Sequence, residues 1–99
     1  MATFGPWEEH IRKHYRDAEC AVAFAVLNAL AVRPQGLDLN NLLAQVAKPA
    51  LTRDALLGVL QRLHIEGFVE VDDWAADQPV SGFRNPLLKR WWQRYRPQP

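Results

Sequence analysis

The feature that most constrains this fold is an apolar stretch from Cys20 to Val32, thirteen residues interrupted only by Asn28. A membrane-spanning helix needs about 20 such residues, so this stretch is too short to cross a bilayer. It also follows several acidic residues, unlike the positively charged start of a secretory signal. A helix that is apolar on most sides must be buried. We therefore expect other elements to surround it, in a cytoplasmic protein that does not contact a membrane.

Length and composition are those of one small globular domain. The chain has 99 residues, of which 48% are hydrophobic and 23% charged. Its single cysteine, Cys20, cannot form an intramolecular disulfide and is expected to be a small core residue. The net charge of +1 indicates no overall preference for a nucleic acid or a membrane surface.

Two helices are predicted in the first third of the chain. Pro6 suits the first position of a helix, where its missing N–H costs nothing. Asp17 is expected to cap a second helix that runs to about Val32. Residues 1–16 would then form an N-terminal helical extension, and whether the two helices are continuous stays open.

The middle of the chain predicts two shorter helices after a brief extended link at Leu37–Leu39. Asn40 is expected to cap the first of them, which would end near Lys48 before a proline. Thr52 is expected to cap the second, and Gly67 to end it. Each helix carries one apolar stripe, which predicts that one side is buried.

After Gly67 the pattern changes from helical to extended. Two short strands are predicted at Phe68–Val71 and Val80–Arg84, separated by a polar loop. Asn85 then precedes a proline, which is typical of a helix start. The apolar residues of this last helix are expected to lie along one broad core face: Leu87, Leu88, Trp91, Trp92 and Tyr95.

Helices followed by a hairpin and a last helix predict a mainly α fold with a small β-hairpin wing. The expected architecture is a winged helix-turn-helix over residues 17–96, with an extra N-terminal helix, a C-terminal amphipathic helix and a tail at 97–99. An isolated hairpin is only marginally stable in water, so it must pack on the helices. The expected core comprises the tryptophans and Val22, Val26, Leu30, Leu43, Val46, Leu56, Leu60, Leu63 and Phe68.

Two segments resemble known winged-helix domains. The spacing Leu56-x3-Leu60-x2-Leu63-x3-Gly67 is similar to their third helix and first wing strand. The segment 83–92, which begins Phe-Arg-Asn-Pro, resembles the end of the winged-helix domain that follows the ATPase core in signal-transduction (STAND) and archaeal-type P-loop ATPases. The sequence has no GxxxxGK[ST] phosphate loop. The resemblance therefore implies a separated domain or a freestanding relative of those proteins.

In DNA-binding winged helices, the helix predicted to begin after Thr52 would lie in the major groove. Its candidate DNA contacts are Arg53, Gln61 and Arg62, because arginine and glutamine both form paired hydrogen bonds with base edges. Asp54 offsets part of the positive charge on this face. A nearly neutral reading helix gains little from the phosphate backbone, so an ordinary solvated helix face is the competing interpretation.

The predicted wing is acidic. Residues 66–83 contain five acidic residues and no lysine or arginine, so this wing would be repelled by phosphates. Trp74 lies near its tip, and tryptophan is enriched where proteins bind each other. Trp74 is therefore a candidate protein contact, unless its side chain folds back on the core.

The C-terminal segment has the opposite charge. Residues 84–99 contain five basic residues and no acidic one, interleaved with aromatic residues. Such a segment suits a nucleic-acid backbone, although the aromatic residues would also serve as a core face. The helix could also lie weakly against the acidic wing. The full set of candidate protein contacts is Trp7, Trp74, Arg84, Arg90 and Arg94.

No catalytic, cofactor or metal site is predicted. His10 and His14 are four residues apart with Asp17 one turn further, a spacing that suits two zinc ligands on one helix. A fourth ligand is not evident, since His64 and Cys20 would reach this site only through the tertiary fold. Nor does any serine or cysteine have a base at a recognisable spacing. The sequence therefore indicates a protein that is not an enzyme.

Two functions are compatible with these patterns. The first is a non-catalytic interaction or regulatory module that docks on a P-loop ATPase or another protein. The alternative is a small sequence-specific DNA-binding transcriptional regulator, dimeric through its first two helices. The acidic wing disfavours duplex DNA, so the protein partner is the leading hypothesis.

Overall fold

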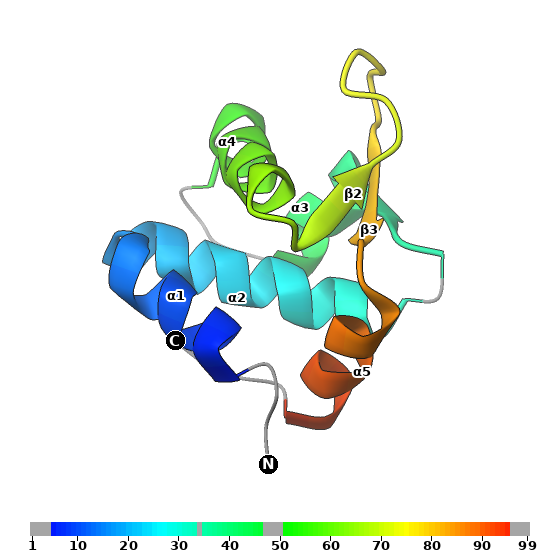
Figure 1. Cartoon of the computed structure of the whole chain (residues 1–99). Helices are drawn as coiled ribbons and strands as arrows, with labels where there is room; N and C mark the ends of the chain where they lie inside the picture. Colours follow the sequence, from blue (N-terminus) through cyan, green and yellow to red (C-terminus); the bar gives the residue numbers. More distant parts are fainter. Residues whose placement is uncertain (1–4, 34, 47–50, 96–99) are drawn as a thin grey trace.

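The computed structural model describes residues 5–33, 35–46 and 51–95, with the side chains of residues 5–7 left out. No helix in this part of the chain is long and apolar enough to cross a membrane. The described residues form five helices and a three-stranded antiparallel sheet (Figure 1). In chain order the elements are α1 (Gly5–His14), α2 (Asp17–Ala31), β1 (Leu37–Asp38), α3 (Leu39–Val46), α4 (Arg53–Ile65), β2 (Val69–Val71), β3 (Val80–Phe83) and α5 (Pro86–Tyr95).

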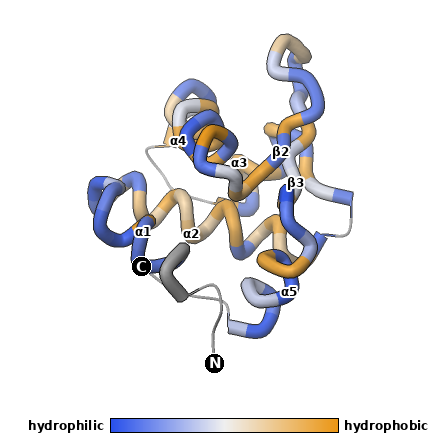
Figure 2. Tube along the Cα trace, viewed as in Figure 1, coloured by the Kyte–Doolittle hydropathy of each residue, from blue (hydrophilic) through white to orange (hydrophobic). Residues whose placement is uncertain are grey.

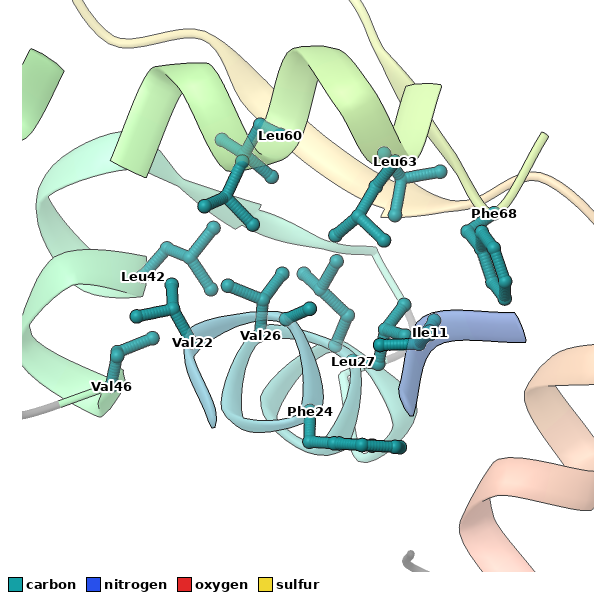
Figure 3. Packing of buried hydrophobic residues seen from close by; sticks show 14 of the residues in the cluster. Ile11, Val22, Phe24, Val26, Leu27, Leu42, Val46, Leu60, Leu63 and Phe68 are labelled. Atoms are coloured by element: carbon teal, nitrogen blue, oxygen red, sulfur yellow. The ribbon is translucent and has the colours of Figure 1, made fainter. Parts of the chain in front are cut away.

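The apolar helix α2 is the centre of the fold, as its sequence predicts. It packs against α1, α3, α4, α5 and β3, and Figure 2 colours it hydrophobic along most of its length. Leu60 and Leu63 of α4 point toward α2, where Val26 and Leu27 meet them (Figure 3). All expected aliphatic core residues and Phe68 are buried, except Leu43, which is partly buried. Burial on several sides explains why α2 is apolar nearly all round.

The first two helices are separate. The chain leaves α1 after His14, and α2 begins at Asp17, with Arg16 between them in an extended conformation. Asp17 is therefore the first helical residue, and the prediction that it caps α2 is wrong. The carboxylate of Glu19 accepts a hydrogen bond from the Arg16 N–H at 3.4 Å, which satisfies a donor at the helix start.

The start of α3 also differs from the prediction by two residues. Asp38 caps this helix, because its Oδ1 accepts the N–H of Asn41 at 2.8 Å, and Asn40 already lies within the helix. The predicted end near Lys48 lies outside the described residues. The prediction for α4 is confirmed, since Thr52 Oγ1 accepts the Ala55 N–H at 3.1 Å.

The sheet has the order β1-β3-β2. β2 and β3 form the predicted hairpin, with Val69 opposite Phe83, and β1 pairs with the other edge of β3 through Leu37 and Ser81. The sequence indicates an extended link at β1 but does not indicate that it joins the sheet. Gly36 makes this approach possible, because its φ is +79° and a Cβ there would lie 2.2 Å from the Ser81 carbonyl oxygen.

The start of α5 is capped as predicted. Asn85 Oδ1 accepts the N–H groups of Leu87 and Leu88 at 2.9 and 3.4 Å. Leu88 and Trp92 are fully buried. The Trp92 ring lies between three other rings, with centroids 6.0 Å from Phe24, 6.4 Å from Phe68 and 6.2 Å from Phe83.

The prediction that all apolar residues of α5 face the core is wrong. Leu87 is 61% exposed and Tyr95 is 51% exposed. Beside the buried Leu88 and Trp92, two polar side chains bond to the end of α2: Lys89 Nζ donates to the Arg33 carbonyl at 2.7 Å, and Gln93 Nε2 donates to the Ala31 carbonyl at 2.6 Å. These bonds satisfy carbonyls at the end of α2. Because Lys89 and Gln93 face α2, the opposite side of α5 must face outward.

Candidate interaction surfaces

The exposed side of α4 carries the three predicted DNA contacts, and two of them bind other parts of the chain. Gln61 is exposed. Arg53, at the start of α4, donates a hydrogen bond to the backbone carbonyl of Asp77 in the loop between β2 and β3. This contact ties α4 to the hairpin and directs the guanidinium of Arg53 toward the loop.

Arg62 is bound to α1. Its Nη2 donates to the His14 carbonyl at 2.6 Å, and its guanidinium carbon lies 3.9 Å from the centroid of the Tyr15 ring. An ion pair with Glu66, at 3.8 Å, adds a third interaction. The Arg62 guanidinium therefore makes a cation–π contact with Tyr15 and donates to a carbonyl at the end of α1 that has no acceptor role within the helix. For Arg62 to contact DNA, all three interactions would have to break.

The same contact between α1 and α4 contains a polar cluster around Glu66. Tyr15 donates its hydroxyl hydrogen to one carboxylate oxygen, and His10 Nε2 bonds to the other. Burial tends to raise the pKa of Glu66, but the hydrogen bonds from Tyr15 and His10 and the nearby cations lower it below its usual value. Burial and the Glu66 carboxylate raise the pKa of Tyr15. The cluster therefore stabilises an ionised carboxylate against a neutral phenol.

The hairpin and its loop carry the exposed acidic residues that the sequence predicts. Asp72 Oδ1 accepts the N–H groups of Asp73 and Val80 at 2.7 and 2.8 Å, which closes the loop. Asp73 Oδ1 accepts the Ala75 N–H at 2.9 Å. Within the described ranges, ion pairs involve neither these two carboxylates nor that of Asp77. Their negative charges are therefore left to solvent.

Trp74 rests against the end of α4. Its ring meets the imidazole of His64 edge-on at 5.5 Å between centroids, and the residue remains 38% exposed. Trp74 therefore lies on the surface of the hairpin rather than in the core. Next to His64, a shallow hollow of about 330 Å³ is lined by residues that include Glu70, Asp72 and Arg84. We call the exposed set Glu70, Asp72, Asp73, Trp74 and Asp77 the acidic hairpin surface.

The outer side of α5 is apolar between two arginines. Trp91 is partly buried, and its ring centroid lies 5.0 Å from that of Tyr95. The guanidinium carbon of Arg94 lies 5.7 Å from the Tyr95 centroid, and Arg90 is exposed. We call the set Leu87, Arg90, Trp91, Arg94 and Tyr95 the basic face of α5.

The two charged segments hardly meet within one molecule. In the described part of the chain, the ion pair that joins them is between Arg84 and Glu70, at 3.7 Å and with both side chains largely exposed. The loop of the hairpin and α5 lie far apart in Figure 1. Of the predicted protein contacts, Arg84 therefore forms an ion pair with the hairpin. Trp74 belongs to the acidic hairpin surface, whereas Arg90 and Arg94 belong to the basic face of α5. The side chain of Trp7 lies outside the described part.

His10 and His14 of α1 lie side by side, as their four-residue spacing in the sequence indicates. The rings of His10 and His14 lie 4.6 Å apart, but His10 bonds to Glu66 rather than joining Asp17. The described residues contain no group of three or more His, Cys, Asp or Glu side chains that could hold a metal ion. Cys20 is buried, and burial raises the pKa of its thiol, which disfavours the reactive thiolate.

Sequence reasoning did not find the contacts of Tyr15 and Glu66. In the sequence Glu66 counts only among the acidic residues of the wing and Tyr15 has no assigned role, and 51 positions separate them. No sequence pattern at either position indicates the pairing.

Comparison with known proteins gives no relative. No protein-family model matches the chain, and neither a curated protein nor a solved structure matches it.

Proposed function

We propose that residues 17–96 form a winged-helix domain with residues 1–16 as a helical extension and 97–99 as a tail, and that it acts as a non-catalytic interaction module. The sheet order β1-β3-β2, with two short helices between β1 and the hairpin, supports this architecture. Its partner would be a P-loop ATPase domain or another protein, as the resemblance of segment 83–92 implies.

The observation that carries this proposal is the state of the two arginines on α4. Arg62 is bound by α1 and Arg53 by the hairpin loop, and the adjacent hairpin is acidic. A DNA-reading face gains its affinity from positive charge facing phosphates. On α4 the guanidiniums of Arg53 and Arg62 make internal contacts, and the exposed charge of the adjacent hairpin is negative, which favours a protein partner over the alternative of a DNA-binding regulator.

A protein partner would meet the surface anchors that the fold presents. Trp74 offers an exposed aromatic ring beside the hollow at His64, and tryptophan and arginine are the residues most enriched in binding hot spots. Arg90 and Arg94 offer a second candidate contact on α5.

Site-specific photo-cross-linking tests the protein-partner proposal. A photoreactive residue at Trp74 or at Arg90 is expected to capture a reproducible protein partner in cells, identified by mass spectrometry. The same residue at exposed Lys13 on α1 is the matched control and should not capture that protein. Equal capture from all three positions, or none from Trp74 and Arg90, would argue against the proposal.

A titration with duplex DNA at low salt tests the alternative. We expect no saturable binding at micromolar protein. Gln61→Ala is the cleanest variant, since Gln61 is exposed and its loss should leave the fold intact, whereas Arg62 variants also lose the contact with α1. Salt-dependent binding that Gln61→Ala weakens would favour the DNA-binding regulator instead.

A further inference from the structure

Both charged surfaces of this protein carry charges that form no ion pair with the described residues. On the acidic hairpin surface, Asp72, Asp73 and Asp77 make no ion pair with any described residue. On the basic face of α5, the same holds for Arg90 and Arg94. Each surface therefore presents charge that a complementary surface could neutralise.

The fold prevents these charges from neutralising each other within one molecule. β3 separates the hairpin loop from α5, and four extended residues span roughly 13 Å. The Debye length at physiological ionic strength is about 8 Å, so the attraction across this gap is largely screened. With a net charge of only +1, the chain also has little overall repulsion between copies.

Each surface also has apolar groups beside its charges. The acidic hairpin surface exposes the ring of Trp74, which is 38% exposed. The basic face of α5 exposes Leu87 at 61% and Tyr95 at 51%. Exposed ion pairs alone contribute little to binding, whereas charges that surround aromatic and aliphatic contacts give both attraction and register.

From this complementarity we propose that the protein binds a second copy of itself, with the acidic hairpin surface of one molecule against the basic face of α5 of the other. The loop that carries Asp72, Asp73, Trp74 and Asp77 precedes β3 and α5 follows it, so their unpaired charges lie at opposite ends of this strand. A two-fold pair in which the copies run antiparallel along β3 therefore forms both contacts at once, which closes the assembly as a dimer. This inference goes beyond the proposed function, because it needs no other protein.

Charge reversal tests the dimer. One variant reverses the hairpin loop, Asp73→Lys with Asp77→Lys, which changes its three unpaired negative charges to a net charge of +1. It keeps the Glu70–Arg84 ion pair and the Asp72 hydrogen bonds that close the loop. The other reverses α5, Arg90→Glu with Arg94→Glu. Each variant alone brings like charges together at both contacts and should remain monomeric. Mixed in equal amounts, the two variants present opposite charges at both contacts and should form a heterodimer.

Sedimentation velocity measures the outcome, at protein concentrations from about 10 to 300 µM in 20 mM and 500 mM salt. The unmodified protein should dimerise at low salt, with at least tenfold weaker association at high salt, because the contact is charged. Lys13→Glu, a reversal elsewhere on the surface, should leave dimerisation unchanged. Circular dichroism and thermal unfolding establish that each variant is folded.

The proposal is overturned if the unmodified protein stays monomeric at low salt, or if the mixture of the two reversed variants does. It is also overturned if dimerisation persists in either variant alone, since the contact would then lie elsewhere. Assemblies larger than a dimer would retain the contact but contradict the two-fold pairing. Both proposals use Trp74 and Arg90, but their tests stay distinguishable, because mass spectrometry separates a cross-link to a second copy of this chain from a cross-link to another protein.

Discussion

The hydroxyl of Tyr15, the residue that follows α1, donates a hydrogen bond to the carboxylate of Glu66, the residue that follows α4. Tyr15 is buried and its ring lies beneath the guanidinium of Arg62. Together with the fully buried Ile11, this contact packs α1 against the rest of the fold. The N-terminal extension is therefore part of the packed structure.

Tyr15→Phe should destabilise the protein by about 1–3 kcal/mol, because the partly buried Glu66 carboxylate loses a donor while the ring and its packing remain. Urea unfolding followed by circular dichroism measures the change. Tyr95→Phe is the matched control: Tyr95 is 51% exposed, and its variant should stay within about 0.5 kcal/mol of the unmodified protein. If Tyr15→Phe changed the unfolding free energy as little as Tyr95→Phe does, the Tyr15 hydroxyl would contribute nothing to stability.

Glu66→Gln should remove a pH-dependent part of the stability. Despite burial, hydrogen bonds from Tyr15 and His10 hold the pKa of Glu66 below the value of about 4.3 expected in the unfolded chain. The ionised carboxylate therefore stabilises the fold above that unfolded value, and this stabilisation is lost as the pH falls through the lower folded pKa.

Urea unfolding between pH 7 and pH 2.5 measures this effect. The difference in unfolding free energy between the unmodified protein and Glu66→Gln should be largest near pH 7 and shrink in acid. Glu70→Gln is the control, since the Glu70 side chain is 66% exposed and should show little pH-dependent difference. A constant difference across the range would contradict an ionised Glu66 as its source.

Two glycine substitutions should have opposite effects. Gly36→Ala should cost more than about 2 kcal/mol, because the left-handed backbone is strained for alanine and the new Cβ meets the Ser81 carbonyl oxygen. Gly58→Ala, in the middle of α4 with nothing near the new Cβ, should stabilise the protein by about 0.5–1 kcal/mol. Thermal unfolding distinguishes the two, and a stable Gly36→Ala variant would show that β1 need not pair with β3.

Trp92→Ala should cost about 3–5 kcal/mol, because it leaves a cavity among the rings of Phe24, Phe68 and Phe83. Trp92→Phe should cost less, since it keeps a ring and also removes an indole N–H that has no hydrogen-bond partner among the described residues. Leu87→Ala, on the exposed side of the same helix, should change stability by no more than about 0.5 kcal/mol. Similar costs at Trp92 and Leu87 would mean that α5 is not oriented as described.

Local signals in the sequence predicted most of the elements. Thr52 and Asn85 cap their helices as expected, and Gly67 ends α4 with a φ of +89°. Where several residues that can cap a helix lie close together, the predicted start of the helix is less exact, since Asp38 rather than Asn40 caps α3. Competing caps within a few residues are decided by where the preceding strand ends, which depends on its pairing with β3.

The candidate surfaces were predicted only in part. The charge blocks and the position of Trp74 in the hairpin follow from the sequence, because exposed loops keep their charges in solvent. The engagement of Arg62 by His14 and Tyr15 does not, since it joins residues 48 positions apart. Arg62, a candidate DNA contact, therefore binds another part of the chain, and this follows only from the tertiary contact between the end of α1 and α4.

The sequence by itself determined that α2 is buried, that α4 and α5 begin after Thr52 and Asn85, and which segments are acidic or basic. Those properties depend on hydrophobicity, caps and charge, which act over a few residues. The tertiary structure decided which side of α5 faces outward, that β1 joins the sheet, and that Glu66 binds Tyr15 and His10 instead of facing solvent. These outcomes depend on contacts between distant segments, and such contacts form only where the packing of the whole chain brings the partners together.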